Sequence, residues 1–204
     1  MSATSTRIPL AEAEAIAQEI VALLCPSCTR IEIVGSIRRR REDVGDVEIV
    51  CIPKPGEPIR DMFGSTLGYN KSPFEVACWQ MLAARVFSHR LDTNGHRAYG
   101  ERYKRLLYYD IPLDLFAVIE PAQWGVIYAI RTGSAEFSRR LVTPRYMRAD
   151  GLLPSDYAIR DGQLWREPWS QEQRRIVPMV VPTPEEADLF RAIGLAWIPP
   201  EERV

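Results

Sequence analysis

The chain has 204 residues, of which 46% are hydrophobic and 26% are charged, and its formal net charge is -1. This composition is typical of ordinary globular proteins and excludes the fibrous and intrinsically disordered classes. Because no apolar run approaches the roughly 18 residues of a membrane span and the N-terminus lacks the apolar core of a signal peptide, we expect a cytoplasmic protein with no membrane partner.

The first third of the chain is predicted to form a helix, two strands and a second helix. Helical spacing of apolar residues predicts a helix over 9–24, and alternating patterns predict strands over 30–34 and 46–52. The stretch 54–72 is rich in Pro, Gly and Ser, which predicts a loop. Ser72–Pro73 then supplies an N-cap and a first helical residue.

The rest of the chain shows the same two periodicities in shorter segments. The predicted elements are a hairpin of strands over 103–109 and 112–119, a helix from Pro121 to about 132–134, a helix over 135–142, a second hairpin turning at Asp161–Gly162, and a helix over 184–193. This order indicates an α+β protein with a domain boundary near residue 120.

Cys25 and Cys28 have the spacing of half a zinc site. A structural zinc ion needs four ligands, and the other two cysteines, Cys51 and Cys78, stand apart in the sequence. We therefore expect structural cysteines, with a metal or redox role as the alternative.

Two carboxylates, Asp46 and Glu48, stand two residues apart on a predicted strand and so share one face. Their mutual repulsion is costly in an apolar setting, and a hard divalent cation such as magnesium removes it. A third carboxylate on a neighbouring strand completes a two-metal arrangement. Asp114 is the best candidate, and Asp110, in the predicted turn, is the alternative.

A strand that ends at Gly35–Ser36 exposes backbone amides and a hydroxyl, a pattern suited to binding phosphate oxygens. Arg38 and Arg39 follow and can donate paired hydrogen bonds to phosphate. Isolated basic runs usually form solvated faces; the alternative is a nucleic-acid contact, which we predict for the cluster Arg139, Arg140, Arg145 and Arg148.

Taken together, these segments resemble the DNA polymerase beta-like (family X) nucleotidyltransferases. The most specific match is Gly35–Arg39 followed by Gly45–Glu48, a glycine-serine turn ahead of a two-carboxylate strand. The other similar segments, in the family's order, are Arg7–Pro9, Ile111–Asp114, Trp124–Gly125, Arg131–Ser134 with Phe137, and Gly194–Arg203. The resemblance implies a palm domain over 1–120, with a mixed sheet and flanking helices, and a small thumb-like domain over 121–204.

The resemblance also implies a role for each matching position. The catalytic residues, which hold two magnesium ions that manganese can replace, are Asp46, Glu48 and Asp114. The residues that bind the incoming nucleotide are Arg7, Gly35, Ser36, Arg39, Gly45, Thr132, Gly133, Ser134 and Ser138. Glu48 departs from the family, which usually has an aspartate there, and Ile130 and Arg131 replace residues that are commonly aromatic.

The implied activity is addition of nucleotides to a primer 3′-hydroxyl with release of pyrophosphate, as in gap filling or end processing in DNA repair. The expected partners are dNTP, with NTP as the alternative, primer DNA and repair proteins, and the protein is expected to be a monomer. Two alternatives stay open: a nucleotidyltransferase acting on RNA or another acceptor, and a non-catalytic DNA-end-binding module.

Overall fold

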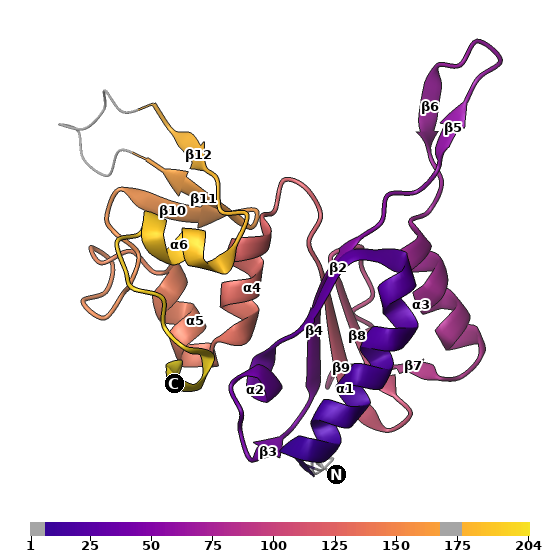
Figure 1. The fold of residues 1–204 in the computed structure, drawn as a ribbon, viewed down its shortest axis with the longest axis horizontal. Coiled ribbons are helices and arrows are strands. Elements are labelled where there is room, and N and C mark those ends of the chain that lie inside the picture. The colour runs from indigo at the N-terminus through magenta and orange to yellow at the C-terminus, as the bar shows by residue number, and fades with distance from the viewer. Residues whose placement is uncertain (1–6, 168–176) are drawn as a thin grey trace. The chain divides into compact units, whose positions relative to one another are not determined.

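The computed structural model describes residues 7–167 and 177–204, which form an α+β protein (Figure 1). The chain divides into two compact units. The first unit comprises Met1–Ile33 and Glu42–Ala117, and the second comprises Val34–Arg41 and Val118–Val204. The division falls close to the expected boundary at 120, but the segment that carries the glycine-serine turn groups with the second unit. No helix in the described ranges is long and apolar enough to cross a membrane.

The first unit is built on a five-stranded mixed sheet. Its strands lie in the order β2 (Cys28–Ile33), β4 (Val47–Pro53), β9 (Ile111–Ala117), β8 (Tyr103–Tyr108) and β7 (Phe87–His89). The central pair, β4 and β9, is parallel, and the other neighbours are antiparallel. The two predicted strands and the first predicted hairpin are therefore confirmed, whereas the edge strand β7 had no clear sequence signal because it has only three residues.

Two helices, α1 (Leu10–Leu24) and α3 (Pro73–Ala83), pack on one face of this sheet (Figure 1). Helix α1 buries an apolar stripe that includes Ile20 and Leu24, as its periodicity predicted. Ser72 caps α3 by accepting a hydrogen bond from the backbone N–H of Glu75 at 3.2 Å, which confirms the predicted start.

The stretch 54–72 is not an irregular loop as predicted. It contains an antiparallel hairpin of β5 (Pro58–Arg60) and β6 (Thr66–Tyr69), which extends away from the five-stranded sheet (Figure 1). Its strands were missed because Pro, Gly and Ser dominate the stretch and the apolar side chains of the hairpin remain exposed. A two-residue pair, β1 (Ile8–Pro9) with β3 (Asp43–Val44), completes the first unit.

The second unit combines helices with a three-stranded antiparallel sheet. Its elements are α2 (Gly35–Arg38), α4 (Trp124–Thr132), α5 (Ala135–Val142), β10 (Tyr157–Arg160), β11 (Gln163–Arg166), β12 (Met179–Val181) and α6 (Glu186–Ala192). Its core consists of apolar side chains from the helices and β11, among them Val126, Phe137, Leu141, Leu164 and Phe190. The predicted turn at Asp161–Gly162 is confirmed, with φ angles of 50° and 75°.

One predicted helix start in this unit is wrong. Helix α4 begins at Trp124 and not at Pro121, because the backbone N–H of Gln123 donates to the carbonyl of Gly162 at 2.8 Å. The Gln123 side-chain oxygen also accepts from the backbone N–H of Thr183 at 2.8 Å. These tertiary hydrogen bonds hold residues 121–123 outside the helix.

Candidate functional site

The β-sheet register brings Glu48 and Asp114 together. The two residues are direct partners on the adjacent parallel strands β4 and β9, so their side chains lie on the same face of the sheet. Asp46 precedes β4 and is two residues from Glu48. The face opposite these carboxylates carries buried residues such as Ile49 and Leu113, and it is the face that the helices cover.

Asp114 has a strongly polar environment although it is only 6% exposed. Arg90 Nη2 donates to both of its carboxylate oxygens, at 3.2 and 3.0 Å, and the Tyr103 hydroxyl donates to Oδ1 at 2.9 Å. Arg105 Nε lies 3.9 Å from Oδ1. Burial and the neighbouring Asp114 carboxylate raise the pKa of Tyr103, so this hydroxyl keeps its proton and acts as a donor. The contacts of Arg90 and Tyr103 with Asp114 were not evident from the sequence. Arg90 directly follows β7 and Tyr103 lies on β8, so only the tertiary structure brings these two residues to Asp114.

The three carboxylates are the right class of ligand for a hard divalent cation, and two of them are neighbours in register. Within residues 7–167 and 177–204, however, no three His, Cys, Asp or Glu side chains converge closely enough to hold a metal ion. Both carboxylate oxygens of Asp114 instead accept hydrogen bonds from Arg90. A cation at this face would therefore have to compete with the Arg90 guanidinium.

A second group of predicted residues comes together inside the second unit. Gly35 has a φ of 64°, which favours glycine, and begins the short helix α2. Arg39 Nη1 donates to the carbonyl oxygens of Thr132 and Gly133, at 2.7 and 2.8 Å. The Gly35–Ser36 turn and the Thr132–Gly133 turn are thus joined through one arginine.

Ser36 has the clearest ligand-like signature in this group. Its hydroxyl is buried and has no hydrogen-bond partner among the residues that the structure describes. A buried polar atom without a partner costs roughly 1–3 kcal/mol, so such atoms are uncommon unless something else binds there. The hydroxyl is therefore suited to donate to an anionic oxygen of a ligand.

Arg38, in contrast, is engaged internally. Its guanidinium makes two hydrogen bonds to the Glu186 carboxylate, at 2.8 and 2.9 Å, and one to the Thr132 hydroxyl at 2.5 Å. Arg203, which is fully buried, donates to the same carboxylate at 2.6 Å. Burial opposes ionisation of Glu186, but the hydrogen bonds from Arg38 and Arg203 outweigh it and lower its pKa to about 2. Arg38 is therefore a structural residue here and not the phosphate ligand that its position suggested.

Two further predicted nucleotide-binding serines use their hydroxyls within the fold. Ser134 caps α5 by accepting from the backbone N–H of Phe137 at 3.0 Å. Ser138 donates to the carbonyl of Ile130 at 2.6 Å. In the first unit, Arg7 is exposed just before β1, and Gly45 is half-buried between β3 and β4.

The predicted DNA-binding arginines lie on and after α5, and all of them except Arg145 contact one acidic residue, Asp150. Arg139 and Arg148 form ion pairs with its carboxylate, at 3.2 and 3.0 Å, and Arg140 donates to its backbone carbonyl at 3.0 Å. Arg145 is exposed and has no carboxylate partner among the described residues. The positive charge of this cluster is thus partly neutralised, which sequence reasoning did not anticipate.

The cysteines are free thiols, and all but Cys25 are buried. Residues Cys25–Ser27 form a single 3-10 turn, η1, after α1. Burial is the main cause that raises the pKa of Cys78, to about 12, so this thiol is protonated and packs as a small apolar group.

The described fold defines an α+β protein whose first unit presents two paired carboxylates and whose second unit is a helical lobe with a small sheet. A family model named DNA polymerase beta thumb matches residues 128–204, which lie within the second unit. This match supports a relationship to the polymerase beta-like family X proteins and indicates a DNA-binding, polymerase-related protein. A comparison with curated proteins found no match.

Proposed function

We propose that the protein is a metal-dependent nucleotidyltransferase, a small family X DNA polymerase that adds nucleotides to a primer 3′-hydroxyl and releases pyrophosphate. The observation that carries the proposal is the register of Glu48 with Asp114 on adjacent parallel strands, with Asp46 two residues before Glu48. The thumb match supports the polymerase relationship independently of these carboxylates.

In this proposal Asp46, Glu48 and Asp114 hold two magnesium ions, or manganese in their place. When bound, such ions neutralise phosphate charge and acidify the attacking hydroxyl. Asp114 must exchange its hydrogen bonds from Arg90 for a metal contact, and Arg105 and Tyr103 keep the face polar while it does so.

Ser36 and Arg39 are proposed to bind the triphosphate of the incoming nucleotide, with Arg7, Gly35 and Gly45 contributing to the same task. The buried Ser36 hydroxyl supplies a donor that is not used inside the fold. Arg39 orients the Thr132–Gly133 turn, which we propose lies against the sugar. Catalysis in such a site comes mainly from positioning and charge neutralisation.

The Arg90–Asp114 ion pair favours a second candidate, a DNA-end-binding module without catalysis, because a guanidinium already satisfies the carboxylate. Labelled single-stranded, recessed and gapped primers, incubated with each dNTP or NTP and with magnesium or manganese, distinguish the two. Extension of any primer supports the enzyme, and the preferred substrate identifies template use, sugar preference and a role in gap filling or end processing.

Substitution of Asp114→Asn tests the site itself, with Asp110→Asn as the matched control. Asp110 is exposed in the β8–β9 turn, so its substitution should leave the activity unchanged. Asp114→Asn should reduce primer extension by at least about 10²–10³, the scale of removing one electrostatic element from an active site. If Asp114→Asn extends primers at the wild-type rate, the proposed role of this residue is wrong.

A further inference from the structure

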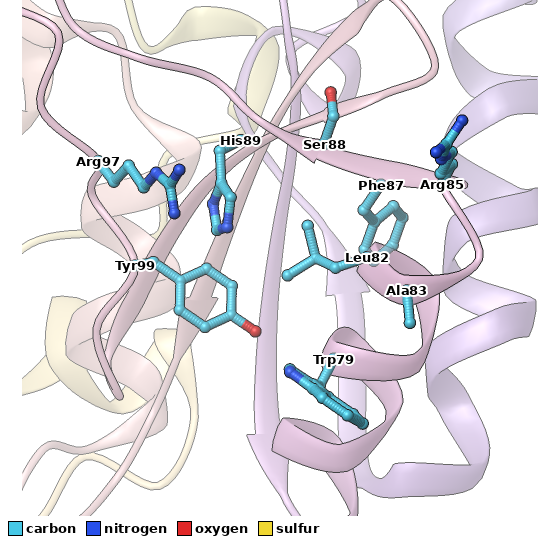
Figure 2. A pocket seen from close by; sticks show the side chains of 9 residues that line it. All are labelled: Trp79, Leu82, Ala83, Arg85, Phe87, Ser88, His89, Arg97 and Tyr99. Atoms are coloured by element: carbon cyan, nitrogen blue, oxygen red, sulfur yellow. The ribbon is translucent and has the colours of Figure 1, made fainter.

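A hollow in the first unit lies at the edge of the sheet, between α3, β7 and the segment that leads into β8. Its volume is about 820 Å³, within the usual range of small-molecule sites. Trp79, Leu82, His89, Arg97 and Tyr99 surround it (Figure 2). The proposed transfer reaction uses none of these residues, and the hollow lies on the helix-covered side of the sheet. His89 faces this side, whereas Arg90, the next residue, contacts Asp114 on the other side.

The walls of the hollow offer aromatic surface to a ligand. The Trp79 side chain projects from α3 and is 68% exposed, which is unusual for an indole. On the opposite side, the rings of His89 and Tyr99 meet edge to face, with centroids 5.2 Å apart. Leu82 provides an apolar surface between the two aromatic sides (Figure 2).

Two buried polar atoms in the hollow have no hydrogen-bond partner among the residues that the structure describes: His89 Nδ1 and the Tyr99 hydroxyl. Burial, and then the charge of Arg97, lower the pKa of His89, so its imidazole is neutral at pH 7. Burial, with Cys78 and Glu75, raises the pKa of Tyr99 to about 12, so its hydroxyl keeps a proton. In Figure 2 that hydroxyl points toward the side of Leu82 and Trp79.

The hollow also carries uncompensated positive charge. Arg97 is exposed beside His89 and makes no ion pair with any residue in the described ranges. Lys104 lies 4.9 Å from the Tyr99 ring, but its ammonium is already bound to Glu75 and to the carbonyl of Gly100. Arg85 also lines the hollow and is exposed, and Arg97 is the arginine that lies beside His89, so Arg97 can attract an anionic ligand on that side.

We propose that this hollow binds a nucleotide, with the base against the indole of Trp79 and the phosphate at Arg97. A base has a flat π-face that stacks on an aromatic side chain and edge atoms that can hydrogen-bond to Tyr99 and His89. A phosphate matches the guanidinium in charge and geometry. The same chemistry is offered by a free nucleotide and by the 5′-phosphorylated end of a single strand, and the site does not depend on the transfer reaction proposed above.

The test measures binding without catalysis, in EDTA and in the Asp114→Asn background, so that failure here is separate from failure of the proposed enzyme. The probes are AMP, adenosine, and a short single-stranded oligonucleotide with and without a 5′-phosphate. Affinity is measured by calorimetry for the small molecules and by fluorescence anisotropy for the labelled oligonucleotides. Trp79→Phe retains a stacking surface and serves as the conservative variant.

We expect a phosphorylated probe to bind, and Arg97→Gln and Trp79→Ala each to weaken it about tenfold. Both side chains are exposed, so these changes should not unfold the protein. Tyr99→Phe should weaken binding less, and Trp79→Phe should preserve most of the affinity. Arg102→Gln, an exposed arginine outside the hollow, is the charge control and should have little effect.

Binding of AMP assigns the site to free nucleotides, and binding of the phosphorylated oligonucleotide alone assigns it to a strand end. The proposal is overturned if neither phosphorylated probe binds at millimolar concentration. It is also overturned if adenosine binds as well as AMP, or if Arg97→Gln and Trp79→Ala leave the affinity unchanged.

Discussion

Arg90 and Asp114 form an ion pair in which one guanidinium nitrogen lies 3.2 and 3.0 Å from the two carboxylate oxygens. The pair joins the residue that follows edge strand β7 to the centre of the sheet, where Asp114 is the register partner of Glu48. Without Arg90, the neighbouring carboxylates of Glu48 and Asp114 would have less positive charge nearby to offset their repulsion. The Arg90 guanidinium therefore neutralises the charge of Asp114 in this structure, which is the role proposed for a divalent cation.

The first prediction follows from this relationship. Arg90→Gln should lower the free energy of unfolding by about 1–3 kcal/mol in EDTA, because a buried carboxylate loses its charged partner. Magnesium should raise the melting temperature of this variant more than that of the wild type, since the cation can replace the guanidinium. Thermal unfolding with and without magnesium measures both effects.

Arg105→Gln is the control, because Arg105 lies 3.9 Å from Asp114 and should matter less. Equal magnesium responses in both variants and the wild type would argue against a cation at this face.

The second prediction compares two serine hydroxyls. Ser36→Ala should leave stability unchanged or slightly higher, because the Ser36 hydroxyl is buried without a partner among the described residues. Ser134→Ala should cost about 1 kcal/mol, because it removes the N-cap of α5. Only Ser36→Ala should raise KM for the incoming nucleotide strongly. Urea unfolding and steady-state kinetics on both variants provide the comparison, and an unchanged KM in Ser36→Ala would remove Ser36 from the phosphate site.

The third prediction concerns acid stability through Glu186. Its pKa in the folded protein is about 2, below the usual value of 4.5. A lowered carboxyl pKa contributes stability that is fully present above the unfolded value and is lost as the pH falls toward 2, on the order of 3 kcal/mol. The wild type should therefore lose stability between pH 4.5 and about 2, and Glu186→Gln should lack this part of the pH dependence.

At pH 7 the same substitution should destabilise the second unit by about 3–5 kcal/mol, because the fully buried Arg203 and the half-buried Arg38 both lose their counter-charge. Denaturant unfolding at several pH values measures both effects. Glu202→Gln, an exposed neighbour of Arg203, is the control and should behave as the wild type. An unaltered pH profile in Glu186→Gln would show that another group causes the acid sensitivity.

The fourth prediction concerns the salt dependence of DNA binding by the basic cluster. Each phosphate contact contributes about 0.9 to the slope of log affinity against log salt. Arg145→Gln should reduce the magnitude of this slope by about 0.9, the contribution of one contact. Arg139→Gln should change the slope less, because Arg139 is already paired with Glu136 and Asp150. Titration of a labelled DNA duplex at several salt concentrations gives the slopes. If Arg139→Gln has the larger effect, the ion pairs with Glu136 and Asp150 must open when DNA binds.

The sequence alone determined the features that depend on local periodicity and turn chemistry. The apolar stripe of α1, the Ser72 cap of α3 and the Asp161–Gly162 turn follow from short-range rules, and the structure confirms them. The two-residue spacing of Asp46 and Glu48 also predicts that both lie on one side of a strand; the observed strand begins at Val47, so it includes Glu48, and Asp46 directly precedes it. These features are predictable because each depends on residues within a few positions of one another.

Only the tertiary structure decided which partners these residues receive. The pairing of Glu48 with Asp114 depends on strand register across 66 positions, and the contacts that join Arg39 to Gly133 span 94. The engagement of Arg38 with Glu186 could not be distinguished from phosphate binding, because an arginine side chain serves either role equally well. Local sequence sets the geometry of the backbone, whereas the charge that faces each side chain is set by segments far apart in the chain.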